Sequence, residues 1–324
     1  MVKLTEGVGL NRYSIVVPAY NAEATLRETL SAISSQVYSH WECVVVDDGS
    51  VDDTLDIAES YARDDRRFRT VSQENRGISG AYNTGVAGSC GDFVVICSAD
   101  DLLLPNHLAV MDRLIESHPG HGIYSSNGEY LDHSTGMRTV VYTAAEWQQQ
   151  RSLAFADVLK ACFFSVGATY RRELFDMLGG YRGIIGEDYD FWLRAMAAGV
   201  THLYTPDRLA VHRVSSFQQS ANVRRVLEAD IATLHNLLGM DLVTDEQRPL
   251  VESAIAGRVH DLTVGPAERF VDQVLEQQSE AFRARVESIV GARRADATLR
   301  LLHKVTWVTR PLRRRWARRR QNPR

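Results

Sequence analysis

Cysteine is scarce in this chain, and long hydrophobic runs are absent. The 324 residues include four cysteines, and no two of them form a CxxC pair. Cys43 and Cys97 fall inside apolar runs, where free thiols behave as small hydrophobic side chains, so we expect reduced cysteines in a cytosolic protein. No stretch approaches the ~18 apolar residues of a membrane span, and the N-terminal residues contain no apolar signal core.

Two nucleotide-binding fingerprints are also missing. The segment Asn75-Arg76-Gly77 is not spaced as GxGxxG, and no Lys-Ser/Thr follows it. Neither a dinucleotide fold of that type nor a P-loop is therefore supported.

Charge is distributed unevenly along the chain. The net charge is −4, but residues 310–324 contain eight Arg and no acid. Removing these eight from the 37 basic residues leaves 29 against 41 acidic residues, so the body is acidic and the tail is basic. Trp307 and Trp316 lie within or beside the Arg-rich run. An anionic membrane surface is the preferred partner for residues 299–324; nucleic acid is not expected, and a solvated tail is the alternative.

Short apolar runs alternate with helical patterns over the first hundred residues, which predicts a doubly wound α/β sheet. Pro18 is expected to end the first strand, and Asn21 to cap the first helix. The strands are expected at 13–17, 42–46, 68–72 and 92–97, and the helices at 21–35, 52–62, 77–88 and 105–117.

The rest of the chain is less regular, and it becomes helical after about residue 222. An amphipathic helix is predicted at 187–198, and His107 is expected at the surface or in a loop. The other expected strands are 121–126, 138–142, 165–170, 201–204 and 208–213, with a helix at 151–160.

Three acidic clusters follow in order along the chain: VVVDDGS at 44–50, ICSADDLLLP at 96–105 and GEDYDFWLR at 186–194. The first two end predicted strands, so their carboxylates should emerge together at the carboxyl edge of the sheet, where such folds bind ligands. Carboxylates in this position suit a metal-bound diphosphate.

These motifs together resemble the family 2 glycosyltransferases of GT-A fold, over residues 13 to about 215. The resemblance implies a GT-A type doubly wound mixed sheet flanked by helices, with a helical C-terminal extension. It also implies transfer of a sugar from a nucleotide diphosphate to an acceptor hydroxyl, with inversion. The motifs that carry it are VVPAYNAE (16–23), VVVDDGSVDDT (44–54), ENRGISGAYNTG (74–85), SADD (98–101), LGGY (178–181) and GEDYDFWLR (186–194).

The resemblance places the nucleotide at the ends of the first strands. Asp48 would accept a hydrogen bond from the base, and Arg76 would pair with a phosphate or contact the base; the alternative for both is ordinary turn chemistry. The residues expected to bind the nucleotide-sugar are Pro18, Ala19, Tyr20, Asp48, Asn75, Arg76, Gly77 and Asp100.

A divalent cation, Mn²⁺ or Mg²⁺, is implied at Asp100, with Asp101 and His212 as further ligands. Ser98 stands where the family commonly has its first Asp. The acids could instead cap the following helix, and a lone His is more often structural.

The pair Glu187-Asp188 is expected to supply the catalytic base, Asp188 by the resemblance and Glu187 as the alternative. The alternative is that Glu187 and Asp188 are ordinary acidic residues at a helix N-terminus, stabilised by the helix macrodipole.

We therefore predict a metal-dependent inverting hexosyltransferase that takes a nucleotide-diphospho-sugar, with UDP preferred to dTDP and GDP. Its acceptor would be a surface glycan or glycolipid, and its location cytoplasmic, peripheral on the inner face of the membrane. Residues 1–220 would form the glycosyltransferase domain and 221–324 a helical region. The alternatives are a nucleotidyltransferase and a non-catalytic sugar-nucleotide-binding partner.

Overall fold

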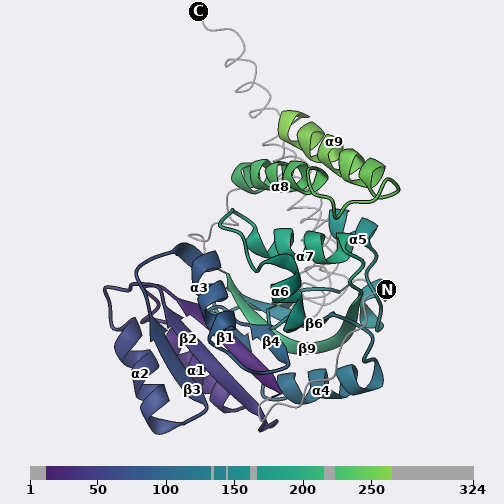
Figure 1. The fold of residues 1–324 in the computed structure, drawn as a ribbon. Coiled ribbons are helices and arrows are strands. Elements are labelled where there is room, and N and C mark those ends of the chain that lie inside the picture. Colours follow the sequence, from purple (N-terminus) through teal and green to yellow (C-terminus); the bar gives the residue numbers. More distant parts are fainter. Residues whose placement is uncertain (1–11, 133–134, 144, 161–165, 215–222, 265–324) are drawn as a thin grey trace, which may run out of the picture. The chain divides into compact units, whose positions relative to one another are not determined.

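The computed structural model describes residues 12–264, apart from 133–134, 144, 161–165 and 215–222. The described residues form a nine-stranded mixed sheet of order β3-β2-β1-β4-β8-β6-β9-β5, with β7 paired to β6 outside this path (Figure 1). The strands are β1 (Tyr13–Ala19), β2 (Trp41–Asp47), β3 (Phe68–Ser72), β4 (Phe93–Ile96), β5 (Leu102–Leu103), β6 (Ile123–Asp132), β7 (Arg138–Val140), β8 (Thr169–Arg171) and β9 (His202–Val214). The helices are α1 (Leu26–Ser34), α2 (Thr54–Asp64), α3 (Gly77–Ala87), α4 (His107–Ser117), the 3-10 turn η1 (Ala145–Gln148), α5 (Phe155–Lys160), α6 (Glu173–Leu178), α7 (Glu187–Ala197), α8 (Val223–Leu238) and α9 (Arg248–Val264).

Strands β3, β2, β1 and β4 are parallel and form the first half of the sheet. All seven residues of β1 and of β2 are buried, because helices cover both faces of this half. Alternate residues sort to the two faces: Ile15 and Val17 pack in the core that contains α1, α2 and α4. Val16 faces the other way and packs with α3, α6 and α7. The predicted doubly wound arrangement is confirmed.

Pro18 does not end β1, contrary to the prediction. It pairs with Val46 of β2 inside the strand. Residues of even number in β1 direct their backbone groups toward β4, as shown by the bond from Cys97 N to Val16 O at 3.1 Å. The pairing of β1 with β4 stops at Val16, so the missing N–H of Pro18 removes no ladder hydrogen bond.

Asn21 does not cap α1, which begins at Leu26 after Thr25. Its backbone has a positive φ of 48°, a conformation that Asn tolerates better than most residues. Its N–H donates to Ser50 Oγ at 3.0 Å, and its Oδ1 accepts from Val51 N at 3.0 Å. Asn21 therefore ties the loop after β1 to the loop after β2.

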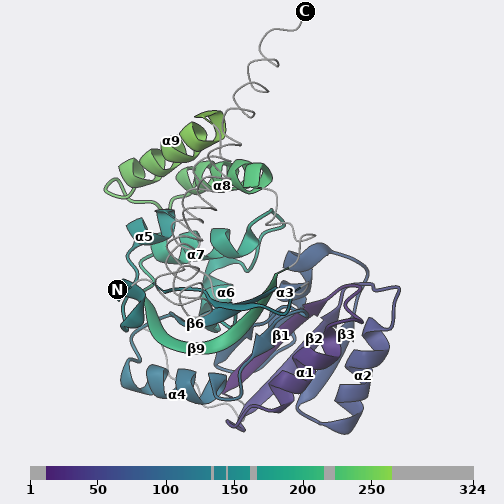
Figure 2. The same ribbon diagram turned by 180° about the vertical axis from the view of Figure 1, so that it is seen from behind.

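The second half of the sheet is built on β9, a single bent strand in place of the two predicted at 201–204 and 208–213 (Figure 2). The residues between them form an irregularity of the ladder opposite Ser126 and Asn127, where the register with β6 shifts twice. A bulge bends a strand without ending it, but it interrupts the hydrophobic pattern, so the sequence predicted two strands here. This bend carries β9 across to β5.

His107 is fully buried, so its expected surface position is wrong. Its Nδ1 lies 3.1 Å from Leu209 O, which ties the start of α4 to β9. Burial lowers the pKa of His107 to about 4, which identifies a neutral core imidazole.

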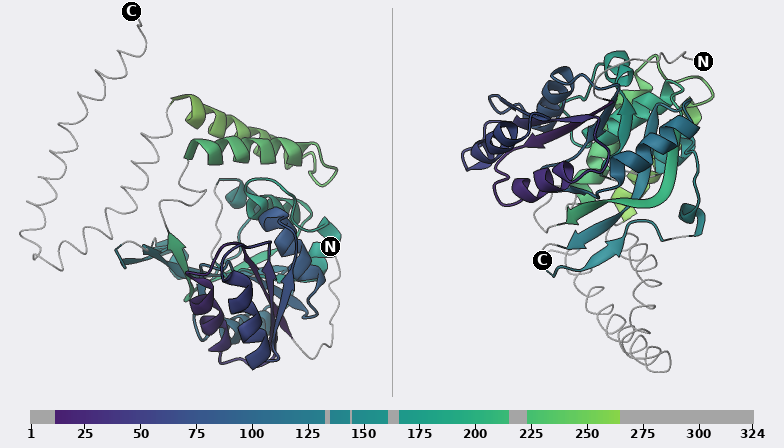
Figure 3. Two further views of the ribbon diagram at one scale, coloured as in Figure 1. Left: turned by 90° about the vertical axis from the view of Figure 1, so that its left-hand side faces the viewer. Right: turned by 90° about the horizontal axis from the view of Figure 1, so that it is seen from below.

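Helices α8 and α9 lie side by side and belong to the same compact unit as the sheet (Figure 3). Leu234, Leu237, Val251 and Ile255 join the core that contains Trp192 of α7. The domain boundary at residue 220 stays a prediction. The basic tail and Cys162 lie outside the described residues. Within the described part of the chain, no helix has the length and apolar character needed to span a membrane.

Candidate active site

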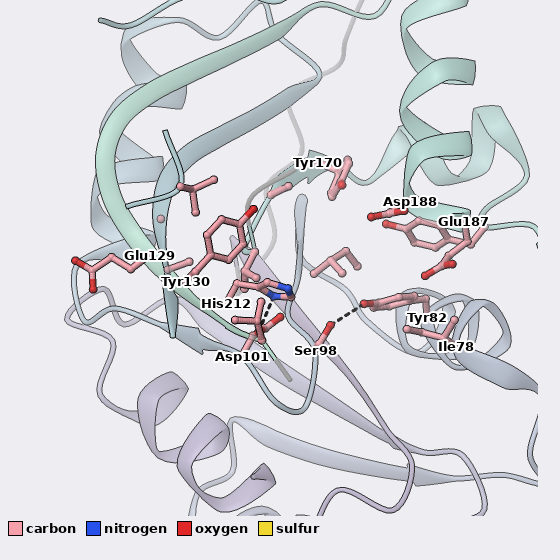
Figure 4. A pocket seen from close by; sticks show the side chains of 18 residues that line it. Ile78, Tyr82, Ser98, Asp101, Glu129, Tyr130, Tyr170, Glu187, Asp188 and His212 are labelled. Carbon is pink, nitrogen blue, oxygen red and sulfur yellow. Dashed lines mark hydrogen bonds and ion pairs between the residues drawn. The ribbon is translucent and has the colours of Figure 1, made fainter. Parts of the chain in front are cut away.

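A cavity of about 540 Å³ opens between the carboxyl edge of the parallel strands and the start of α7 (Figure 4). Its volume is within the range of small-molecule sites. Glu187 and Asp188 lie on one side, and Asp101 and His212 on the other. The lining residues are Ile78, Tyr82, Ile96, Ser98, Asp101, Gly128, Glu129, Tyr130, Val141, Val166, Ala168, Tyr170, Tyr181, Glu187, Asp188, Ala210, His212 and Val214.

The pair Glu187-Asp188 opens α7 and is partly buried. Burial raises the pKa of Glu187 to about 7, and the neighbouring charge of Asp188 adds to the shift. Burial also raises the pKa of Asp188, although the backbone N–H of Tyr189 donates to its Oδ1 at 2.7 Å. Desolvation therefore outweighs the helix dipole, which would lower both values. Such carboxylates are suited to accept a proton near neutral pH.

Asp190, the third acid of the same motif, has a structural role. It is fully buried, and its Oδ2 accepts hydrogen bonds from Arg194 Nε at 2.8 Å and from Arg182 Nε at 3.0 Å. The Arg194 guanidinium also donates to the carbonyl oxygens of Leu178 and Gly180, at 2.6 and 2.8 Å. This network fixes the LGGY segment against α7.

The same segment is attached to α3 through an asparagine. Asn83 Nδ2 donates to Tyr181 O, and Asn83 Oδ1 accepts from Tyr181 N, both at 2.8 Å. The rings of Tyr181 and Tyr82 lie 5.0 Å apart. These contacts place Tyr82 and Tyr181 in the cavity wall beside Glu187.

On the opposite wall, Asp101 is buried and holds His212. The imidazole Nδ1 donates to Asp101 Oδ1 at 3.0 Å, and the same oxygen accepts from Arg213 N at 3.0 Å. Burial alone would lower the pKa of His212, but the hydrogen bond and charge of Asp101 raise it overall. With Nδ1 held in this way, Nε2 is the ring nitrogen left for a ligand in the cavity.

No group of three or more His, Cys, Asp or Glu side chains within the described ranges is arranged to hold a metal by itself. Asp100 is half-buried and its charge adds to the rise in the pKa of His212, but it is not among the residues that line the cavity, and the ligand roles predicted for Asp100 and His212 stay predictions. The ligand role predicted for Asp101 itself stays a prediction. Ser98 Oγ lies 3.4 Å from Tyr82 OH and supplies a neutral hydroxyl to the cavity.

The predicted nucleotide-binding residues lie at the ends of β1 and β2 and before α3. Asp48 is buried, and its Oδ1 accepts from Gln73 Nε2 at 2.6 Å and from Arg76 N at 2.9 Å. Gln73 Oε1 in turn accepts from Thr84 Oγ1 at 2.6 Å. Both of these bonds to the carboxylate use Oδ1. These bonds tie the loop after β2 to the turn before α3, and the nucleotide-binding role of Asp48 stays a prediction.

The remaining residues of this group have simpler settings. Pro18 and Ala19 are in β1, and Ala19 O accepts from Asp48 N at 2.8 Å. Tyr20 follows the end of β1 and is 53% exposed, and its nucleotide-binding role stays a prediction. Asn75 Oδ1 accepts from Gly77 N at 3.2 Å, and Gly77 opens α3 with φ 72°.

The structure brings Glu187 and Asp188 to one cavity with the Asp101–His212 pair, while Asp48 follows β2 at the same edge of the sheet. β1 separates β2 from β4, so the ends of these strands are about 10 Å apart, the reach of a nucleoside diphosphate. Tyr82, Tyr130, Tyr170 and Tyr181 also line the cavity and were not predicted as site residues. The spacing of Ile78 and Tyr82 on one helix face is a signal that could have indicated Tyr82.

Residues 14–179 match the family described as Glycosyl transferase family 2. The match covers just over half of the chain, so the protein belongs to this family of glycosyltransferases.

Relatives of known sequence are described as glycosyltransferases. The chain is 31% identical over 172 residues to the uncharacterized glycosyltransferase EpsJ of Bacillus subtilis, covering 50% of this chain and 48% of that protein. It is 24% identical over 262 residues to an uncharacterized glycosyltransferase of Haemophilus influenzae, covering 74% of this chain and 79% of that protein. The chain spans less than two thirds of the length of three of its relatives: 58% and 27% of two of them, and 48% of EpsJ.

Solved structures share the fold. S. aureus TarS 1-349 in complex with UDP-GlcNAc matches with a TM-score of 0.64 at 18% identity, covering 88% of this chain and 83% of that one. The mannosyltransferase PcManGT of Pyrobaculum calidifontis, in complex with GDP-Man and Mn²⁺, matches with a TM-score of 0.60 at 20% identity, covering 96% and 86%. The expected GT-A type fold is confirmed.

Proposed function

We propose that this glycosyltransferase uses a nucleotide-diphospho-sugar, preferably a UDP-sugar, and transfers the sugar with inversion to a hydroxyl of a glycan or glycolipid. The observation that carries the proposal is the cavity itself. Two carboxyl groups of raised pKa face an aspartate-held imidazole across it. The complexes of TarS with UDP-GlcNAc and of PcManGT with GDP-Man support a nucleotide-sugar donor. Family membership favours this function over a nucleotidyltransferase.

The chain's own residues have separate tasks in this reaction. Asp48 Oδ2 accepts the N–H of the base, and Arg76 lies at the turn beside it. Asp188 removes the proton of the acceptor hydroxyl, and the oxygen forms a bond to the anomeric carbon. The bond from that carbon to the diphosphate breaks on the opposite face, so configuration inverts and the nucleoside diphosphate leaves. Tyr82 and Tyr181 exclude water around the sugar.

A divalent cation, Mn²⁺ or Mg²⁺, would be held by Asp100 and His212 Nε2, and it would supply positive charge to the departing diphosphate. Asp101 holds the imidazole so that Nε2 faces the cavity. The Mn²⁺ in the PcManGT complex supports this part of the proposal.

The test measures release of nucleoside diphosphate and transfer of labelled sugar from a panel of UDP-, dTDP- and GDP-sugars, with Mn²⁺ and mixed glycan and glycolipid acceptors. Asp188→Asn should lower kcat by about 10²–10⁴ with donor binding unchanged, because Asn keeps the bond from Tyr189 N but accepts no proton. If Glu187→Gln loses activity and Asp188→Asn keeps the kcat of the wild type, Glu187 is the base. Donor binding without any turnover would leave the non-catalytic binding partner as the function.

A further inference from the structure

Arg258 of α9 is a buried cation that links three other helices. Its Nε donates to Asp230 Oδ2 of α8 at 2.9 Å. One terminal nitrogen donates to Leu159 O of α5 at 2.8 Å, and the other donates to the phenol oxygen of Tyr189 of α7 at 2.8 Å. Only 8% of Arg258 is exposed. A guanidinium desolvated to this extent needs all of these acceptors, and its planar fork fixes their relative positions.

Tyr189 connects this cation to the base of the proposed reaction. Its ring is 2% exposed and lies 5.6 Å from the Arg258 guanidinium carbon. Its backbone N–H donates to Asp188 Oδ1 at 2.7 Å. One residue therefore separates the Arg258 guanidinium from the Asp188 carboxylate, with a hydrogen bond on each side of it.

The start of α7 needs such support. Its N-cap position is Gly186, which has φ 76° and no side chain to cap the helix. A helix start without a side-chain cap is free to fray, and here it carries both Glu187 and Asp188. The phenol of Tyr189 is held from α9 and α5, so the first turn is fixed from its side instead of its end.

Arg258 and Asp230 lie in a part of the chain that the family match does not include. The match ends at residue 179, and α8 and α9 follow β9. Asp230 offsets the Arg258 charge and lies near enough to act on the base. Burial raises the pKa of Asp188, and the charge of Asp230 adds to that shift.

We propose that Arg258 is a positioning residue for sugar transfer: through Tyr189 it holds the first turn of α7 so that Asp188 faces the acceptor hydroxyl. The inference rests on the proposed function. Proton transfer and attack require the base within hydrogen-bond reach of the hydroxyl, and a displacement of about 1 Å can cost on the order of 10²-fold in rate. The C-terminal helices would then act on kcat and leave donor binding unaffected, because Asp48 and Arg76 belong to other elements.

Three variants test this: Arg258→Met, Arg258→Lys and Tyr189→Phe. Arg258→Met should lower kcat by about tenfold, and Tyr189→Phe by several-fold, with donor Kd within about twofold of wild type. Arg258→Lys should recover part of the loss, since an ammonium still pairs with Asp230 and reaches one carbonyl.

Arg172 provides the matched control. Its guanidinium also donates to two carbonyl oxygens, Gly91 O at 2.5 Å and Val86 O at 3.0 Å, and otherwise to Ser14 and Ser89, so its hydrogen bonds within the described part of the chain do not reach α7. Arg172→Met should lower Tm and leave kcat unchanged. If Arg258→Met does not fold, Tyr189→Phe decides, because it keeps the ring and loses only the hydroxyl.

The inference is overturned if the wild type transfers sugar while the Arg258 and Tyr189 variants keep wild-type kcat and lose only Tm. It is also overturned if Arg172→Met loses kcat to the same extent, since general destabilisation would then explain the effect. A wild-type protein that binds donor and transfers nothing would count against the proposed function instead.

Discussion

Replacing Glu187 by Gln should make the protein more stable at alkaline pH than the wild type. The carboxyl group is partly buried beside Asp188, and burial raises its pKa from 4.5 to about 7. The folded state therefore binds this proton more tightly than the unfolded chain does. Since the folded state holds more protons between pH 4.5 and about 7, the free energy of unfolding of the wild type falls as pH rises through that window. Glu187→Gln has no carboxyl group at this position, so its free energy of unfolding should not fall for this reason.

The shift sets the size of the effect. One pKa unit corresponds to about 1.4 kcal/mol, so the rise from 4.5 to about 7 gives an upper limit of about 3 kcal/mol. Water reaches part of the Glu187 side chain and screens its charge, so we expect about 2 kcal/mol in the measurement. Asp188 is present in both proteins, and its own contribution largely cancels in the difference.

The assay is urea unfolding of wild type and Glu187→Gln at about pH 5 and about pH 8, with m-values compared to confirm the same transition. The variant should gain about 2 kcal/mol relative to wild type between the two conditions. Glu252→Gln, on the exposed side of α9, controls for the loss of one negative charge. Stability curves of wild type and Glu187→Gln that run parallel across this range would refute the desolvated carboxyl pair.

Three further predictions concern the donor and the tail. Asp100→Ala should abolish the Mn²⁺-dependent part of UDP binding with Tm unchanged in the absence of ligand; wild-type affinity and metal response in calorimetry would contradict the assignment. Asp48→Asn keeps an acceptor for Gln73 and Arg76 N but presents an amide to the base, so UDP should bind about tenfold or more weakly and with less preference over other nucleotides; an unchanged competition titration would count against base reading. Truncation after Thr309 should release the protein from anionic liposomes, because each basic residue contributes about 1 kcal/mol at such a surface; equal sedimentation of both forms would remove the membrane partner.

The parallel half of the sheet could be read from the sequence. Continuous apolar runs such as 43–46 favour a strand buried on both faces, and the Asp residues that follow them are then expected at one edge of the sheet. The same reasoning holds for α7, where Phe191 and Trp192 face the core as predicted. These predictions succeeded because each depends on neighbours in the chain.

The errors arose where a distant partner decides the outcome. Pro18 continues its strand because β4 has already stopped pairing there, and Asn21 serves the loop after β2 instead of a helix end. His107 looks like a surface residue until β9 covers it. The bulge in β9 is a break in the pattern but not in the strand.

The same distinction between local sequence and distant partners applies to the residues of the candidate site. Residue types and their order were enough to place Asp48, Asp100 and Glu187-Asp188 at strand ends and a helix start, since local sequence determines where an element ends. Only the tertiary structure decided which of these carboxyl groups are desolvated, and which side chains and backbone groups donate hydrogen bonds to them. Desolvation raises the pKa of Glu187, Asp101 accepts a hydrogen bond from His212, and Arg258 donates to the Tyr189 phenol from 69 residues away. Burial and hydrogen bonding depend on what packs around a group, and no local pattern contains that information.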